Sequence, residues 1–255
     1  MSCYHCHQIR CTGITTPGIS ATLKYDDIGR MESYTATDIA SKATLTIKLT
    51  FDDFSREIRR DITDQKGQSV CSIAQTYYPN GQVKNRTTTR GDESLRDEKY
   101  TYNNRNQLID YICSGTEKSL DAYGKAITHQ AFTYGVLGNI TSLVAEFEEG
   151  KDTASYTYAA NDPTQLYSVT HIHKDYPALQ TPTYDNAGQL TDDGVGHTLS
   201  YDALGRVNNI QGTKSQGCTY RYDASNTQVG QDTSGGSQHD FYYAQVPGYR
   251  SSFQN

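Results

Sequence analysis

The sequence contains no tryptophan, only six prolines, and no apolar run long enough to cross a membrane or to act as a secretion signal. No window of about 11–18 residues shows the periodicity of an amphipathic helix. The formal net charge is −6 and no basic patch is visible, so we expect neither a nucleic-acid partner nor a membrane span. These absences favour an all-β protein without significant helix, and 255 residues suit one β domain.

Signatures of catalysis are also scarce. There is no GxSxG motif, and serine is scattered without an identifiable base. The acidic run at Glu146, Glu148 and Glu149 could shift a carboxyl pKa by like-charge repulsion, but a solvated hairpin end explains it as well. We therefore expect a protein that is not an enzyme and has no cofactor.

Two groups of residues could ligate a metal ion. Cys3, Cys6 and Cys11 offer thiolates near the N-terminus, but one CxxC without a partner motif is a weak zinc signal. His171, His173 and Asp175 would share one face of an extended strand, because side chains alternate with a period of two. A poorly ordered terminus and a polar strand face explain both groups more simply, so we expect free cysteines and no tightly bound metal.

What the chain does contain is a repeat, clearest at residues 201–207, YDALGRV. Tyr201 is a good strand former, and Asp202 can accept a hydrogen bond from the backbone two residues on and so start a turn. Gly205 can adopt the left-handed conformation that closes a type I turn with a bulge, and Val207 restarts the strand. Each copy therefore predicts one β-hairpin.

Ten copies follow one another at a mean spacing of about 22 residues, within the range of repeat arrays. We align them on starts at Tyr25, Phe51, Tyr78, Tyr102, Leu120, Tyr134, Tyr158, Tyr184, Tyr201 and Tyr222. The repeat-defining residues are Tyr25, Asp26, Gly29, Phe51, Asp52, Tyr102, Tyr134, Gly138, Tyr184, Asp185, Gly188, Tyr201, Asp202, Gly205, Tyr222 and Asp223.

Departures from the pattern follow turn chemistry. Asn106 and Asn226 replace the glycine, and Asn is one of the few other residues that tolerate the left-handed region. The Tyr78 copy is expected to have a shortened turn and the Tyr158 copy a lengthened one, while Ser55 stands where glycine is expected.

These repeats divide the chain into a poorly ordered segment 1–21, a repeat region 22–243 and a tail 244–255. Within the repeat region, we interpret the charged runs 61–68 and 87–97 as exposed turns or loops. The run 230–238, which is rich in Gly, Ser, Thr and Gln, is interpreted as a link.

The residues of the repeat resemble the YD repeats of the Rhs family, as in YDDIGRM, YDNAGQL and HTLSYDALGRV, over roughly residues 22–243. Within that family, the repeat sequences are most similar to the Rhs region of C-type components of bacterial insecticidal toxin complexes. The resemblance implies that the hairpins form part of a spiralling, cocoon-like β-sheet shell around a sequestered polypeptide.

By the same resemblance, the expected role is to encapsulate and help deliver a C-terminal effector. The partners would be the remainder of the toxin shell and the effector, and the protein would be secreted or exported with the assembly. The tail 244–255 would lead toward an Rhs-associated core, and its self-cleavage motif has no match here, because Asp162-Pro163 lies inside a repeat. The alternative is a carbohydrate- or protein-binding module that presents its tyrosines to cell-surface glycans.

Overall fold

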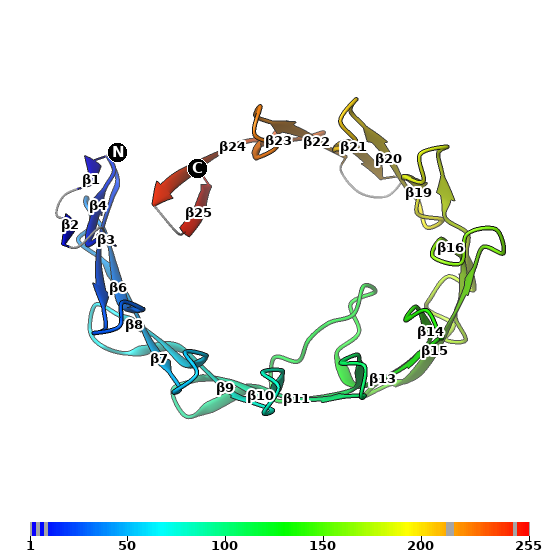
Figure 1. Ribbon diagram of the computed structural model, residues 1–255, viewed down its shortest axis with the longest axis horizontal. Coiled ribbons are helices and arrows are strands. Elements are labelled where there is room, and N and C mark those ends of the chain that lie inside the picture. Colours follow the sequence, from blue (N-terminus) through cyan, green and yellow to red (C-terminus); the bar gives the residue numbers. More distant parts are fainter. Residues whose placement is uncertain (1, 4–5, 8–9, 213–216, 247–248, 255) are drawn as a thin grey trace. The chain divides into compact units, whose positions relative to one another are not determined.

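The computed structural model describes residues 2–3, 6–7, 10–212, 217–246 and 249–254. All regular secondary structure in this described part is β-strand, and every pairing between the strands is antiparallel, so the all-β prediction is confirmed (Figure 1). No helix in the described part is long and apolar enough to cross a bilayer.

The strands are short and follow one another along the whole chain. The first are β1 (Ser2–Cys3), β2 (Cys6–His7), β3 (Arg10–Cys11), β4 (Gly13–Thr15), β5 (Ile19–Tyr25), β6 (Met31–Asp38), β7 (Thr44–Phe51), β8 (Glu57–Asp64), β9 (Ser69–Tyr77), β10 (Val83–Arg90), β11 (Glu93–Tyr102) and β12 (Leu108–Ser114). The others are β13 (Ile127–Tyr134), β14 (Ile140–Phe147), β15 (Gly150–Tyr158), β16 (Leu166–Thr170), β17 (Leu179–Gln180), β18 (Thr183–Tyr184), β19 (Leu190–Asp192), β20 (His197–Tyr201), β21 (Val207–Gly212), β22 (Cys218–Tyr222), β23 (Gln228–Thr233), β24 (Gln238–Val246) and β25 (Tyr249–Gln254).

The chain forms two compact units, where its length suggested one domain. The first unit comprises Met1–Phe132 and Val144–Lys151, and the second comprises Thr133–Leu143 and Asp152–Asn255. In the first unit the hydrogen-bonded order is β1-β4-β5-β6 and onward in sequence to β13. In the second unit β15-β16-β17 and β18 through β25 are likewise paired in sequence order. Each hairpin thus lies next to the hairpin that follows it.

The strands form because apolar and polar residues alternate along them. In β7, Ile47 is 6% exposed, and its neighbours in sequence are a threonine and a lysine on the other face. The buried core is thin: in the first unit it centres on Tyr111, Cys113 and Ile127, with Tyr100 and Phe132 packed against them. With so little buried, the backbone ladders and the turns must define the fold.

Three sequence-based assignments are wrong in the described part. Residues 61–64 belong to β8, and most of 87–97 belongs to β10 and β11, so these charged runs are largely strand. Residues 10–21 contain β3, β4 and the start of β5 rather than a poorly ordered terminus. The supposed link 230–238 is the hairpin between β23 and β24. In a sheet with one solvated face, charged residues occupy strands as readily as turns.

The tail predicted for residues 244–255 is also structured where it is described. Residues 249–254 form β25, which pairs with β24.

Candidate functional site: the repeat turns and the two faces of the sheet

The repeat turns share one backbone geometry. In the turn after β20, the amide of Asp202 donates to the carbonyl of Arg206 (2.9 Å), and the amide of Gly205 donates to the carbonyl of Asp202 (2.9 Å). The same pair of bonds closes the turns that begin at Asp26, Asp52, Tyr78, Asn103, Asp121, Gly135, Asp185 and Asp223. The loop from Ala159 to Gln165 is two residues longer, in line with the lengthened turn expected there: the amide of Ala159 donates to the carbonyl of Gln165, and the amide of Gln165 donates to that of Asp162.

The aspartate supplies further bonds inside the turn. Oδ1 of Asp202 accepts from the amides of Leu204 (2.9 Å) and Arg206 (3.1 Å), which is the local bonding expected of this residue type. Oδ2 accepts from the Arg206 guanidinium at 2.7 Å. This hydrogen bond, together with those from the amides, lowers the pKa of the Asp202 carboxyl below its ordinary value.

The fifth position of the repeat adopts the left-handed conformation. Gly205 has φ 77°, and Asn106, Asn226 and Ser55 have φ 61°, 62° and 61°. Ser55 therefore takes the same conformation as the glycine that it replaces.

The copy aligned on Tyr78 is a full-length turn, not a shortened one. The amide of Tyr78 donates to Gln82, so Tyr78 occupies the aspartate position. Tyr77 pairs with Val83 just as Tyr201 pairs with Val207, so Tyr77 is the aromatic position. Two adjacent tyrosines made both alignments consistent with the sequence.

The copy at Leu120 also departs from the prediction. Its turn has the repeat geometry, but it is flanked only by the single bridge between Leu120 and Ala126. Lys118 pairs with Glu148 at 2.8 Å and Lys125 lies over the ring of Phe147, so this turn contacts the end of β14. It is a short excursion between β12 and β13, not a hairpin of the ladder.

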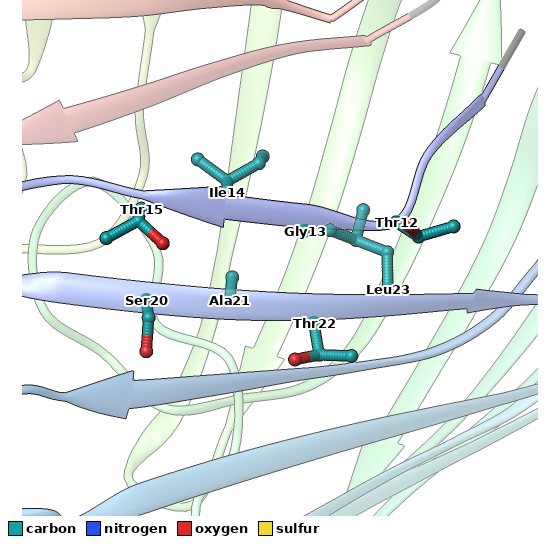
Figure 2. A pocket seen from close by; sticks show the side chains of 8 residues that line it. All are labelled: Thr12, Gly13, Ile14, Thr15, Ser20, Ala21, Thr22 and Leu23. Atoms are coloured by element: carbon teal, nitrogen blue, oxygen red, sulfur yellow. The ribbon is translucent and has the colours of Figure 1, made fainter. Parts of the chain in front are cut away.

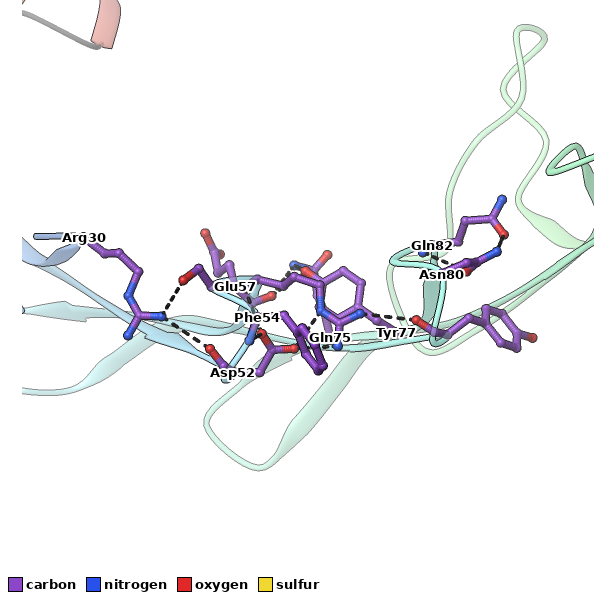
Figure 3. Close-up of polar contacts among 11 residues, drawn as sticks. Arg30, Asp52, Phe54, Glu57, Gln75, Tyr77, Asn80 and Gln82 are labelled. Atoms are coloured by element: carbon purple, nitrogen blue, oxygen red, sulfur yellow. Dashed lines mark hydrogen bonds and ion pairs between the residues drawn. The ribbon is translucent and has the colours of Figure 1, made fainter. Parts of the chain in front are cut away.

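Figure 3 shows how one turn is tied to the next by the side chain that follows the left-handed residue. Nη1 of Arg30 donates to the carbonyl of Asp52 (3.3 Å) and to the hydroxyl of Ser55 (3.1 Å) in the next turn. Its Nε pairs with Asp26 in its own turn at 2.6 Å. Its Cζ lies 4.8 Å from the centroid of the Phe51 ring, which places the cation over the aromatic position of the next unit.

We call this arrangement the arginine clamp, and it recurs at Arg56 and Arg206. Arg56 donates to the carbonyl of Tyr78 (3.2 Å) and lies 4.6 Å from the ring centroid of Tyr77. Arg206 donates to the carbonyl of Asp223 in the next turn (3.2 Å) and lies 4.7 Å from the ring centroid of Tyr222. The basic residue of the repeat therefore ties consecutive hairpins together, a role that the sequence pattern did not reveal.

Shorter polar side chains at the same position make a simpler tie. The contacts run from Gln82 Nε2 to the carbonyl of Asn106 (3.2 Å), from Asn139 Nδ2 to that of Pro163 (2.6 Å) and from Gln189 Nε2 to that of Gly205 (3.3 Å). Each bond again reaches the following turn.

The aromatic position is tied in the opposite direction. Its hydroxyl donates to the carbonyl of the residue that restarts the strand in the preceding unit. The pairs are Tyr77 with Glu57 (2.6 Å), Tyr158 with Ile140 (2.7 Å), Tyr201 with Leu190 (2.8 Å) and Tyr222 with Val207 (2.8 Å). These phenol hydroxyls therefore serve the fold.

The same contacts identify a further, degenerate unit before Tyr25. The hydroxyl of Tyr25 donates to the carbonyl of Cys11 (2.8 Å), and the guanidinium of Arg10 lies 5.7 Å from the Tyr25 ring centroid. A Cβ at Gly29 would meet that guanidinium, so Arg10 also reaches the next turn. Arg10-Cys11 thus occupies the place of Arg30-Met31, although its flanking sequence lacks the repeat pattern.

The two faces of the sheet differ in chemistry. Residues that are direct partners on neighbouring strands share a face, so Leu23, Tyr34 and Ile47 lie together, on the face that also carries the repeat aromatics of β5 and β7. The other face of the first unit is rich in hydroxyls, and Thr35 bonds Thr46 across it (3.0 Å). We call these the aromatic face and the hydroxyl face.

Two carboxylates are buried in the sheet. Glu98 is 6% exposed and accepts from the hydroxyl of Tyr111 at 2.7 Å. Burial, with the neighbouring Glu98 charge, raises the pKa of Tyr100 to about 12. Both phenols therefore stay protonated at neutral pH and act as donors.

The second buried carboxylate, Asp152, is 3% exposed and holds the loop that follows β16. It accepts from Nδ1 of His171 (2.6 Å) and from the amides of Ile172 (3.0 Å) and His173 (2.9 Å). Burial alone would raise the pKa of Asp152, but the His171 ring and these amides outweigh burial and lower it. The rings of His171 and His173 each lie 5.3 Å from Tyr176.

The described residues test the two candidate metal sites only in part. Residues 171–175 do not continue the strand, so the predicted shared face of His171, His173 and Asp175 is wrong. The thiol of Cys11 donates to the carbonyl of Gly13, whereas the side chains of Cys3 and Cys6 lie outside the described residues. In the part of the chain that is described, no group of three or more potential ligands is placed to hold a metal ion.

Figure 2 shows a hollow of about 420 Å³ between β4 and β5. It is lined by Thr12, Gly13, Ile14, Thr15, Ser20, Ala21, Thr22 and Leu23. No carboxylate, imidazole or thiol lines it, so its serine and threonine hydroxyls have no general base among the lining residues to activate them. The distinctive features of this protein are the side-chain contacts that tie consecutive turns together and the different chemistry of the two faces of the sheet.

Comparison with known proteins gives structural likeness only. No family model and no curated protein matches the chain. Among solved structures, the chain is similar to chains of the TcdB2-TccC3-Cdc42 crystal structure (TM-score 0.63, 14% identity) and of TcdB2-TccC3 without its hypervariable C-terminal region (TM-score 0.62, 15% identity). Each match covers 93% of this chain and 14% of the other chain. The protein therefore has the β-sheet fold found in part of these toxin-complex chains.

Proposed function

We propose that this chain is a structural segment of a toxin-complex shell, and that the shell encloses a polypeptide effector. The observation that carries the proposal is the long series of antiparallel hairpins, broken between β17 and β18, which matches a toxin-complex chain over 93% of the present chain. The chain spans 14% of that chain, so its role is that of one stretch of wall.

The chemistry of the sheet supports a wall. Its side chains are used to tie hairpin to hairpin through the arginine clamp and the phenol hydroxyls. An array that is stabilised between neighbours can extend for many units, as in other repeat proteins. We propose that the chain has no catalytic role. We also propose that it is exported as part of the assembly.

The alternative, a glycan-binding module, receives less support from the same contacts. Sugar-binding aromatics present a free face or hydroxyl to the ligand, whereas the hydroxyls of Tyr77, Tyr158, Tyr201 and Tyr222 are bonded to backbone carbonyls. Binding to a glycan array would favour the alternative.

A chimera tests the proposal. This chain replaces the structurally matching stretch of the TccC3-containing chain, and a reporter polypeptide takes the place of the segment after it. We expect the reporter to resist added protease, as in the parent, and to be digested when the stretch is deleted. A folded chimera whose reporter is digested as fast as in the deletion would contradict the proposal.

A further inference from the structure

One position of the repeat turn lies at the tip of the turn, away from the strands. The aspartate, the left-handed residue and the basic residue make the bonds described above, and the residue before the left-handed position is exposed at Ile28, Phe54, Asn80 and Arg105. There Ile28 is 68% exposed, and Phe54 is 80% exposed although Cζ of Arg56 lies 5.1 Å from its ring centroid. Turn chemistry favours polar residues at such positions, so large apolar side chains there indicate a contact surface.

In the first unit four repeat turns lie at the same end of the strands, after β5, β7, β9 and β11. We call the exposed pair of residues in each turn a tip. The tips are Asp27-Ile28, Asp53-Phe54, Pro79-Asn80 and Asn104-Arg105, and all eight residues are exposed. Arg30, Arg56 and Gln82 tie each turn to the next, so the four tips form one continuous row.

The row is self-complementary. Its first tip carries an acidic and an apolar residue, and its last tip carries Arg105. When a second row runs in the opposite direction, Asp27 meets Arg105 at both ends, and Phe54 meets Pro79 at the two central tips. A two-fold axis between the second and third turns produces all of these contacts at once, as in an isologous dimer.

The spacing of the row restricts its partner. Successive tips are two strands apart, or about 10 Å, so a partner must offer matching groups at this interval. A second copy of the chain meets this requirement by construction. Its charges are also complementary in the antiparallel arrangement, whereas a parallel arrangement would bring Asp27 against Asp27.

We therefore propose that two copies of this chain associate through their first-unit tips, antiparallel, about a two-fold axis between the Asp53-Phe54 and Pro79-Asn80 tips. The contact is small, so the association is weak and concentration-dependent. It differs from pairing through open strand edges, because backbone ladders take no part.

Sedimentation velocity of the full chain at up to about 100 µM, a range that detects weak interfaces, tests this proposal by charge exchange. Asp27→Arg and Arg105→Asp should each weaken dimerisation by about tenfold or more, because like charges then face each other. The double variant Asp27→Arg/Arg105→Asp restores opposite charges across the axis and should recover the dimer. Phe54→Ser should weaken it without charge change.

Lys66→Asp is the matched control. Lys66 holds the same turn position as Arg105, in a turn of the same geometry closed by Asp64 and Gly67, but at the other end of the strands. It should leave dimerisation unchanged, and thermal unfolding followed by circular dichroism checks that every variant remains folded.

Three results would overturn the proposal. The first is a monomer over the whole concentration range. The second is a dimer that neither single variant weakens, which points to strand edges. The third is a double variant that associates as weakly as the single variants. If Asp27 faces Arg105 across the axis, exchanging the two charges must restore the dimer.

Discussion

The two ends of the strands in the first unit are built by different rules. At one end the turns after β5, β7, β9 and β11 share one geometry and are laced together. At the other end the connections are not alike: Asp64–Gln68 has the geometry of a repeat turn, Asp38–Ala43 is one residue longer with Lys42 at φ 62°, and Gly91 with φ 57° lies in a tight turn. The repeat thus specifies one end of each hairpin and leaves the other end variable.

This difference separates two ways of stabilising the array. The repeat turns rely on many small, equivalent contacts between neighbours. The other end relies on individual solutions, of which the buried Asp152 in the second unit is the most demanding. Substitutions at the two ends should therefore differ in how much they lower the free energy of unfolding.

The largest effect is expected at Asp152. Asp152→Ala should lower the free energy of unfolding by about 3 kcal/mol, because it removes a buried carboxylate that accepts from three donors, among them the ring of His171. Urea unfolding measures the loss. Asp162→Ala, at an exposed turn of the same unit, is the control and should cost less than about 1 kcal/mol; equal losses would contradict the role of burial.

The next effect is expected at the left-handed position of a repeat turn. Gly205→Val should destabilise by about 1–3 kcal/mol, because a β-branched residue is strained at φ 77°. Gly205→Asn should cost much less, since Asn226 and Asn106 hold this position in other copies. Equal midpoints for the two variants in a denaturant titration would show that the turn geometry is wrong.

A smaller effect is expected from the arginine clamp. Arg206→Ala should destabilise by about 1 kcal/mol, because it loses the Asp202 pair and the contact with the Tyr222 ring. Arg206→Lys should recover only part of this loss, since an ammonium lacks the planar fork that binds both turns. If Arg206→Lys recovered the full stability in the same titration, the positive charge alone would account for the clamp, and the guanidinium geometry would not matter.

The smallest and most distributed effect is pH dependence. The pKa values of Asp202 and Asp152 are lowered in the folded protein, so their contribution to stability is complete above the unfolded value near 3.8 and is lost as the pH falls through the folded values. The pKa of His129 is raised, chiefly by the hydrogen bond that its ring donates to the Asp110 carboxylate, so its contribution to stability is present below about 6.5 and is lost as the pH rises through the folded value. Unfolding midpoints measured from pH 3 to 8 should fall steeply at the acid end; a flat profile there would contradict the paired aspartates.

The sequence predicted the fold class and the turns because both depend on local chemistry. Glycine or asparagine at the fifth position and aspartate at the second position specify the turn without reference to the remainder of the chain. The alignment failed at Tyr77-Tyr78, where local chemistry permits either residue as the aromatic position.

The parts that could not be predicted depend on strand register. Arg30 meets Phe51, and Asp152 meets His171, only because pairing brings residues about 20 positions apart into contact. The run 61–68 is charged and poor in apolar residues, which favoured a loop, yet Asp61 lies in β8 and pairs with Arg59 on the hydroxyl face. A sheet with one solvated face gives such residues a place in a strand that their composition does not indicate.

Amide hydrogen exchange resolved by residue tests the central claim that each repeat encodes the same turn. In the turn after β20, the amides of Asp202, Leu204, Gly205 and Arg206 are bonded and should exchange slowly, whereas that of Ala203, for which the described structure gives no acceptor, should exchange fast. The same slow–fast–slow pattern should recur after β7, β18 and β22 and be absent at Gly91-Asp92, where the described structure gives neither amide an acceptor. Uniformly fast exchange across the repeat turns, or slow exchange at Gly91 and Asp92, would contradict the account.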